Sequence, residues 1–427
     1  MTALIRRVRH SFAPDHHDRD FHLFLVVGLF SGLAMGIYST VFNNYLNDVF
    51  ALSSESRGIV EFPRELPGVL VVLVLAVLSF LGDTRMAVVG MLFAALGAAG
   101  LGFLSPSFAL MLLWLMVFSL GTHVVMPLAA GIGMSLSRKE EYGARLGRFS
   151  AYSLGATILG YAIVWVGFRY LGMGYRAAFL LCAAAYGMAA LMLGAMKVNR
   201  PESHKVRLVF RKRYTLYYLL CVVNGARKQV FLTFAPWVLI KVFHLDPPLF
   251  AVLGILVALL GMAIRTVVGR SIDRRGERFV LTAEALVLLA LCLGYAFSEA
   301  VLPAGLAVVV IAACYVVDST TVAVDMARST YVSKIAERPE DVTPTLSAGI
   351  SVDHVVAMSI PILGGLLWAR AGYQAVFLAA AVIALLNLVL SRRLDAVARV
   401  GSAAAADAAR VADAAEPAGA AAGPADS

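Results

Sequence analysis

Apolar residues in this chain form runs of about twenty or more positions, and short polar turns separate them. A helix of about 20 apolar residues spans the roughly 30 Å hydrocarbon core of a bilayer. The pattern therefore predicts an all-α integral membrane protein. Its expected spans are twelve, near residues 22–50, 58–81, 86–104, 107–136, 149–169, 176–197, 215–243, 249–271, 279–297, 302–333, 344–369 and 372–391.

Two short patterns recur about 190 positions apart. The charged turn around Asp273 has a weaker counterpart around Asp83, and 273 − 83 = 190, while Gly36 and Gly225 begin similar stretches at 225 − 36 = 189. The repeat predicts two pseudo-symmetric six-helix bundles. The expected organisation is a cytoplasmic N-terminal segment (1–20), two bundles (21–198 and 214–393), a basic linker (199–213) and a disordered tail (394–427).

Composition agrees with a membrane protein, because 60% of residues are hydrophobic, 15% are charged and the mean hydropathy is +0.81. The net charge is +9, but no soluble basic domain carries it, so we expect the lipid bilayer as a partner and no nucleic acid. Lys and Arg gather in alternate loops, which predicts that both termini are cytoplasmic in the plasma (cell inner) membrane. The external side is expected to hold only a few, namely Arg57, Arg169, Arg176, Lys241 and Arg370.

The turn between spans 8 and 9 reads G-x-x-x-D-R-x-G-x-R. With twelve spans and a duplicated half, the chain resembles the major facilitator superfamily, which implies transport by alternating access, with no cofactor. The matching gating-loop residues are Gly269, Asp273, Arg274, Gly276 and Arg278, and in the first half only Gly82, Asp83 and Arg85. Contacts of this loop are interpreted either as a latch between the halves or as topology anchors at the lipid surface.

Ionisable residues inside membrane spans are costly and point to function. Arg227 and Lys228 are adjacent near the middle of span 7, about 100° apart on a helix, so at least one should face a polar cavity. They either bind an anionic group or pair with carboxylates on other helices, and both interpretations stay open. Further substrate-binding candidates are Asn43, Asn44, His123 and Gln229.

Other polar residues in the spans suggest ion coupling or a buried charge network. The candidates are Glu61, Arg64, Glu65, Asp318, Asp325, Arg328, Asp353 and His354. A histidine beside an acid can relay protons or can form a buried hydrogen-bonded pair. No metal-binding motif is found, and we expect no metal and no cofactor.

No nucleotide-binding or hydrolase motif is present, so the chain is not expected to be an enzyme. The sequence predicts a monomeric secondary active transporter of a small molecule, an organic anion, coupled to protons. An exporter of amphipathic or drug-like compounds is the alternative, and a non-transporting membrane sensor or assembly factor is an alternative of another class.

Overall fold

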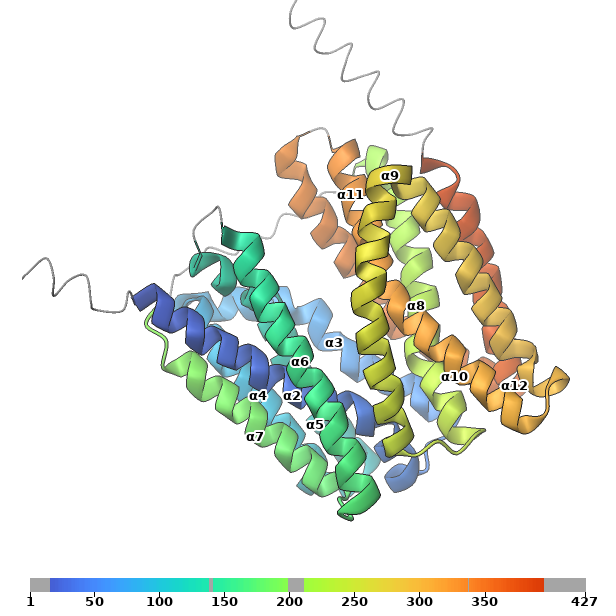
Figure 1. The fold of residues 1–427 in the computed structure, drawn as a ribbon, viewed down its shortest axis with the longest axis horizontal. Helices are drawn as coiled ribbons and strands as arrows, with labels where there is room; N and C mark the ends of the chain where they lie inside the picture. The colour runs from blue at the N-terminus through green and yellow to red at the C-terminus, as the bar shows by residue number, and fades with distance from the viewer. Residues whose placement is uncertain (1–15, 138–140, 199–210, 337, 395–427) are drawn as a thin grey trace, which may run out of the picture.

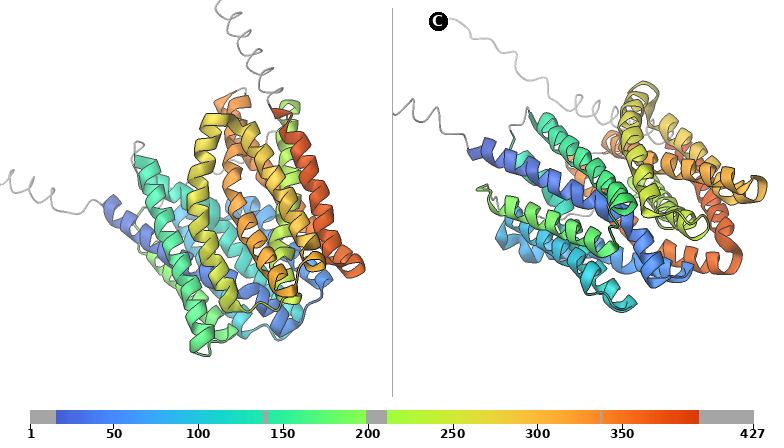
Figure 2. Two further views of the ribbon diagram at one scale, coloured as in Figure 1. Left: turned by 45° about the vertical axis from the view of Figure 1, so that its right-hand side comes forward. Right: turned by 60° about the horizontal axis from the view of Figure 1, so that its bottom comes forward.

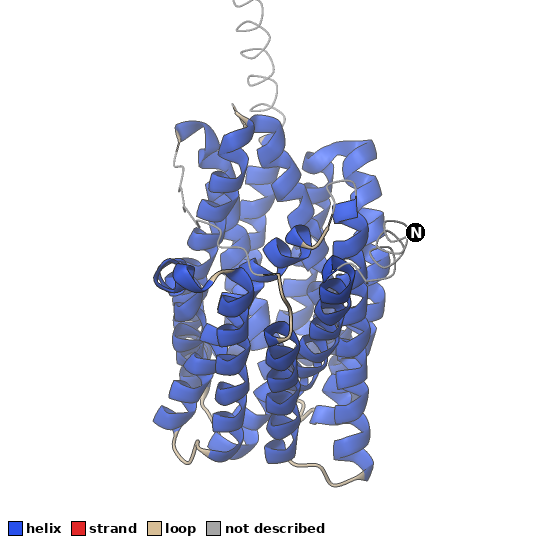
Figure 3. Ribbon diagram, turned by 90° about the vertical axis from the view of Figure 1, so that its left-hand side faces the viewer, coloured by secondary structure: helices blue, strands red, loops and turns tan. Residues whose placement is uncertain are grey.

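The computed structural model describes residues 16–137, 141–198, 211–336 and 338–394. These residues form helices and connecting loops, with no strand among them (Figure 3). The first set of helices is α2 (His16–Phe50), α3 (Ser54–Leu78), η1 (Ser79–Leu81), α4 (Asp83–Phe103), α5 (Phe108–Ser135), α6 (Tyr142–Tyr170) and α7 (Tyr175–Gly194). The second set is η3 (Lys212–Tyr214), α8 (Thr215–Lys241), α9 (Pro247–Val301), α10 (Ala304–Thr320), η4 (Thr321–Val324), α11 (Asp325–Ile335) and α12 (Pro339–Ser391).

The two longest helices each contain a sharp reversal at a glycine. α9 has 55 residues and α12 has 53, far more than the roughly 20 that cross a bilayer. Gly276 and Gly372 both have φ +80°, a conformation that favours glycine, so each helix doubles back there. Nine stretches of the described residues are long and apolar enough to span a membrane. Dividing α9 and α12 and adding the more polar α8 gives 9 + 2 + 1 = 12, compatible with the predicted count.

Span 10 is less regular than the sequence predicted. The expected continuous run at 302–333 is divided by the 3₁₀ segment η4 between α10 and α11. Three consecutive hydroxyl side chains, Ser319, Thr320 and Thr321, lie where α10 passes into η4. Each donates a hydrogen bond to a carbonyl oxygen three or four residues earlier. Such bonds compete with the helical ladder and favour a local change of winding.

The predicted domain boundaries stay predictions. The predicted N-terminal segment (1–20) overlaps the helix that follows it, since α2 begins at His16 rather than after residue 20. Most of the expected linker (199–210) and the expected tail beyond 394 lie outside the described residues. Figures 1 and 2 show α2–α7 and α8–α12 as two sets of helices lying side by side.

Each set has its own buried apolar core. One cluster runs through α2–α7, from Phe21 to Met196, and takes in Trp237 and Ala251 from the second set. Two further clusters, one including Phe234 and the other Tyr214, belong to the second set of helices. Burial between helices thus links the helices within each set.

Glycines permit the closest helix crossings in both sets. A Cβ at Gly36 of α2 would overlap the backbone of Thr157 in α6, and a Cβ at Gly225 of α8 would lie 2.5 Å from Oδ1 of Asp353 in α12. The two glycines that the sequence repeat aligned therefore occupy comparable helix crossings. Small residues at such crossings let helix backbones approach in a membrane.

Gly36→Ala is expected to lower the stability of the protein by about 1–3 kcal/mol, because the added methyl group must push α2 and α6 apart. Thermal unfolding of the purified protein in detergent measures the change. Gly155→Ala on α6 is the matched control, since nothing lies within 4 Å of a Cβ there. Equal melting temperatures for the two variants would contradict the prediction.

Candidate functional site

A cavity of about 530 Å³ lies between the two sets of helices. Its wall comes from α3, α5, α8, α11 and α12, so both halves of the chain contribute. The acidic and basic side chains that line it, histidines included, are Arg64, Glu65, His123, Lys228, Asp325, Arg328, Asp353 and His354. Apolar side chains, including Met126, Leu232 and Ile350, complete the wall.

The two sets of helices are packed tightly at one end of the cavity. A Cβ at Gly58 of α3 would overlap the backbone of Pro361 in α12, and Ser54 donates a hydrogen bond to the carbonyl of Gly365 at 3.4 Å. Asn44 of α2 donates to the carbonyl of Leu245 at 2.7 Å, a further link at this end. Toward the other end, which carries the Gly276 reversal, the two sets diverge (Figure 1).

Glu61 is the centre of a buried charge network on α3. Its side chain is 1% exposed and accepts from Arg57 at 2.5 Å and from Nε of Arg64 at 2.6 Å. Gln229 of α8 donates to the same carboxylate at 3.0 Å, which joins the two halves. Arg64 also pairs with Glu65 at 2.8 Å. Two guanidinium groups thus offset the cost of burying Glu61.

The position of Arg57 differs from the one that the sequence predicted. The prediction placed it among the external loop charges, but it lies inside α3, is 2% exposed and is paired with Glu61. The second bond of its guanidinium goes to Oδ1 of Asn43 at 3.0 Å. The error arose because α3 begins at Ser54, four residues before the predicted start of that span.

The two basic residues of α8 have different partners. Arg227 is 5% exposed and pairs with Asp318 of α10. Lys228 reaches across to Asp353 of α12, with Nζ 2.5 Å from Oδ2. The Lys228 and Asp353 side chains are 25% and 24% exposed, and both line the cavity. Both residues are therefore paired with carboxylates, which was one of the two interpretations of the sequence. Of the two, only Lys228 lines the cavity.

A third basic residue, Arg328 of α11, bridges two acids. It lies 2.6 Å from Glu284 of α9 and 2.7 Å from Asp325, whose side chain is half exposed. Asn224 of α8 donates to Asp325 at 3.4 Å. Glu284 was missed by the sequence analysis, although an acid within the apolar run of span 9 was a sufficient signal.

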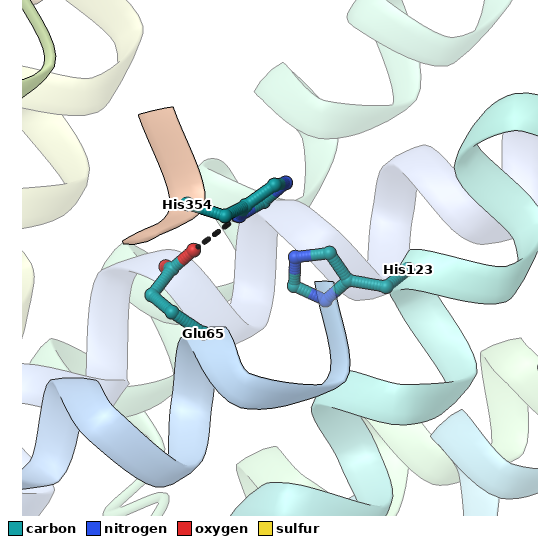
Figure 4. A group of neighbouring side chains, drawn as sticks. All are labelled: Glu65, His123 and His354. Carbon is teal, nitrogen blue, oxygen red and sulfur yellow. Dashed lines mark hydrogen bonds and ion pairs between the residues drawn. The ribbon is translucent and has the colours of Figure 1, made fainter. Parts of the chain in front are cut away.

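Two histidines and a carboxylate meet at the cavity wall. His354 of α12 has Nδ1 3.1 Å from Oε2 of Glu65, and the ring centroids of His123 and His354 are 5.3 Å apart. His123 directs a ring nitrogen toward the other two side chains (Figure 4). Its Nδ1 lies 2.9 Å from the carbonyl oxygen of Ser119.

Some predicted site residues lie elsewhere. Asn43 and Asn44 are engaged in the contacts with Arg57 and Leu245 described above and are not among the residues that line this cavity. Gln229 lines it but is 1% exposed and bonded to Glu61.

Both gating loops contain a glycine with positive φ, and these two glycines are four residues out of register with the sequence alignment of the loops. Gly82 has φ +77° and Gly276 has φ +80°, and each precedes a buried acid at the first position of the next helical stretch, Asp83 and Glu277. These glycines are 276 − 82 = 194 positions apart, whereas the sequence analysis paired Asp83 with Asp273. Glu277 pairs with Lys334 at 2.8 Å.

The other loop residues are mostly at the surface. Asp273, Arg274, Arg278 and Arg85 are exposed, and Gly269 is half-buried. Within the described part of the chain, Asp273 makes no ion pair, so the latch interpretation for it stays a prediction. The ion pair of Glu277 with Lys334 joins α9 to α11 within the second set of helices, so it is not a contact between the two halves.

The family model of the Major Facilitator Superfamily matches residues 24–342. The chain belongs to this superfamily. No curated protein sequence matches it. The superfamily and the helical fold make it a multi-pass membrane transporter rather than an enzyme.

Solved structures of transporters share the fold. A nucleoside transporter, NupG, is 12% identical, with a TM-score of 0.72 and coverage of 88% of this chain and 99% of the other. A bacterial homologue of the human lysosomal transporter Spinster is 13% identical, with a TM-score of 0.67 and coverage of 91% and 99%. A peptide transporter, POT, is 13% identical, with a TM-score of 0.69 and coverage of 89% and 95%. At these identities the likeness shows the fold alone.

Proposed function

We propose that this superfamily member is a secondary active transporter that moves a small organic anion together with a proton by alternating access. The supporting observation is the charge balance of the cavity wall. Three basic residues (Arg64, Lys228 and Arg328) face the cavity with three acids (Glu65, Asp325 and Asp353).

Because the positive and negative charges of the cavity wall balance, binding of an anionic solute requires a compensating positive charge. An anion entering alone would leave one uncompensated negative charge in a partly desolvated cavity, which is unfavourable. Protonation of one carboxylate offsets that charge. The anion and the proton then stabilise each other in the same conformation, and this mutual stabilisation is a coupling free energy between two ligands.

The Lys228–Asp353 pair is the best-placed site for this exchange. Both side chains are about one quarter exposed and face the cavity, whereas Arg227 and Asp318 are more deeply buried. When Asp353 is protonated, its attraction for Lys228 weakens, and the ammonium group becomes available to an anionic group of the solute. Met126, Leu232 and Ile350 provide apolar surface for the body of the same solute.

The positive-inside pattern supports the cell inner membrane, with both termini cytoplasmic. In that orientation the packed end, around Gly58 and Pro361, is external. In this proposal the diverging end faces the cytoplasm, so the conformation is inward-facing. Alternating access requires the packed contacts to separate as the opposite end closes.

The proposal is tested with purified protein in liposomes and a panel of radiolabelled mono- and dicarboxylates. An imposed pH gradient is expected to drive accumulation of at least one of them. Asp353→Asn should retain counterflow but lose the response to the gradient, because the residue can no longer change charge. His22→Ala, at an exposed position on α2, is the control variant.

Three outcomes would overturn the proposal. Counterflow of a carboxylate that is indifferent to pH in the wild type would exclude proton coupling. Exchange of amphipathic drug-like compounds without any carboxylate exchange would favour the exporter, and binding of a solute without counterflow of any kind would favour a sensor.

A further inference from the structure

Three side chains with metal-binding chemistry converge where the two halves meet. One ligand atom each from Glu65, His123 and His354 lies within 4.8 Å of the others. Glu65 belongs to α3, His123 to α5 and His354 to α12, so the group is assembled from three helices of both sets (Figure 4). We propose that these residues bind a divalent first-row transition-metal ion such as Zn²⁺.

The donor set suits such an ion. Zn²⁺ binds imidazole nitrogens and carboxylate oxygens, and a site with three protein ligands leaves a fourth tetrahedral position free. Imidazoles favour Zn²⁺, Cu²⁺ or Ni²⁺ over the hard cations Mg²⁺ and Ca²⁺, which prefer oxygen ligands. The free position is on the cavity side, since all three residues line the cavity.

Neighbouring groups orient the ligands. The carbonyl oxygen of Ser119 lies 2.9 Å from Nδ1 of His123, an arrangement that places the proton on Nδ1 and leaves the Nε2 lone pair for a metal. On Glu65, Oε1 is held by Arg64 at 2.8 Å, whereas Oε2 faces His354. A metal bound at Oε2 would therefore replace only the hydrogen bond to His354, and Arg64 would keep its carboxylate partner.

A glycine makes the approach of the two rings possible. A Cβ at position 68 would lie 2.6 Å from Cε1 of His354 and 2.9 Å from Cδ2 of His123. Gly68 is one helical turn beyond Glu65, so the same face of α3 supplies the carboxylate and the open space beside it. Any larger residue would displace one or both imidazoles.

The ligand atoms must close in slightly on binding. Donors about 2.0–2.1 Å from a tetrahedral ion are about 3.4 Å apart. Glu65 Oε2 and His354 Nδ1 already meet this spacing at 3.1 Å. Only His123 has to move closer, and its ring is partly exposed on the cavity wall.

Binding is measured on full-length protein purified without a histidine tag and stripped with a chelator, by competing Zn²⁺ against a chromophoric indicator. One site is expected. His123→Ala, His354→Ala and Glu65→Gln should each lower the affinity for Zn²⁺ at least about 10-fold. Losing a residue that only contacts a ligand of a metal site already costs about that much. Gly68→Ala should weaken binding while all three ligands are retained.

The matched control replaces His16 and His17 together by alanine, since adjacent histidines can bind metal adventitiously. X-ray absorption of the zinc-loaded wild type adds a measurement that needs no variant, and it is expected to show imidazole nitrogens at about 2.0–2.1 Å. Binding that is lost in the His16/His17 variant but retained in the other four would overturn the proposal, as would a zinc spectrum without imidazole. These measurements involve no transport, so their failure would leave the proposed function untouched.

Discussion

Arg227→Met is expected to lower the free energy of unfolding by about 3–5 kcal/mol, because it leaves the buried Asp318 carboxylate without its partner. Arg227 is 5% exposed and Asp318 is 9% exposed, so water cannot replace the lost contact. Thermal unfolding in detergent and the yield of monodisperse protein measure the effect. This loss should exceed that of any single substitution at the more exposed Lys228.

The double variant Arg227→Met/Asp318→Asn separates a structural role from a binding role. Removing both charges eliminates the uncompensated carboxylate, so most of the stability should return. If Arg227 instead binds the solute, the double variant will remain defective in binding although it is stable. A melting temperature for Arg227→Met equal to that of the wild type would contradict the structural role.

The all-helical membrane fold could be predicted from the sequence because it depends on local patterns. Apolar runs of the right length mark the helices, and the breaks predicted at 272–278 and 370–371 lie at or beside the reversals at Gly276 and Gly372. The pairing of Gly36 with Gly225 also led to comparable helix crossings. The sequence analysis aligned the two loops four residues out of register, because it matched the charged residues Asp83 and Asp273. The positive-φ backbone conformation instead repeats at Gly82 and Gly276.

The partners within the site were less predictable, since they depend on how distant helices are placed. The sequence suggested carboxylate partners for Arg227 and Lys228, but only the packing of α8 against α10 and α12 assigns Asp318 to one and Asp353 to the other. His123, His354 and Glu65 come from three separate helices, and their meeting depends on the space at Gly68. No local pattern encodes such a meeting.

The decisive variant for the proposed function is Lys228→Met, whose effect should appear in solute binding. Removing a partly desolvated positive partner of an anion costs on the order of 2–5 kcal/mol, or roughly thirty-fold or more in affinity. Lys228→Arg should keep part of the affinity, because it retains the charge but changes the length and geometry of the side chain. Equilibrium binding of the transported carboxylate to purified protein provides the measurement.

Asp353→Asn should act in the opposite direction at neutral and alkaline pH. Without the carboxylate, Lys228 has no competing partner in the pair, so the anion binds more tightly and its affinity no longer rises on acidification. In the wild type, affinity should rise as the pH falls, since protonation of Asp353 releases Lys228. Unchanged affinity in well-folded Lys228→Met, or an Asp353→Asn variant that keeps the pH dependence of the wild type, would rule out this pair as the coupling site.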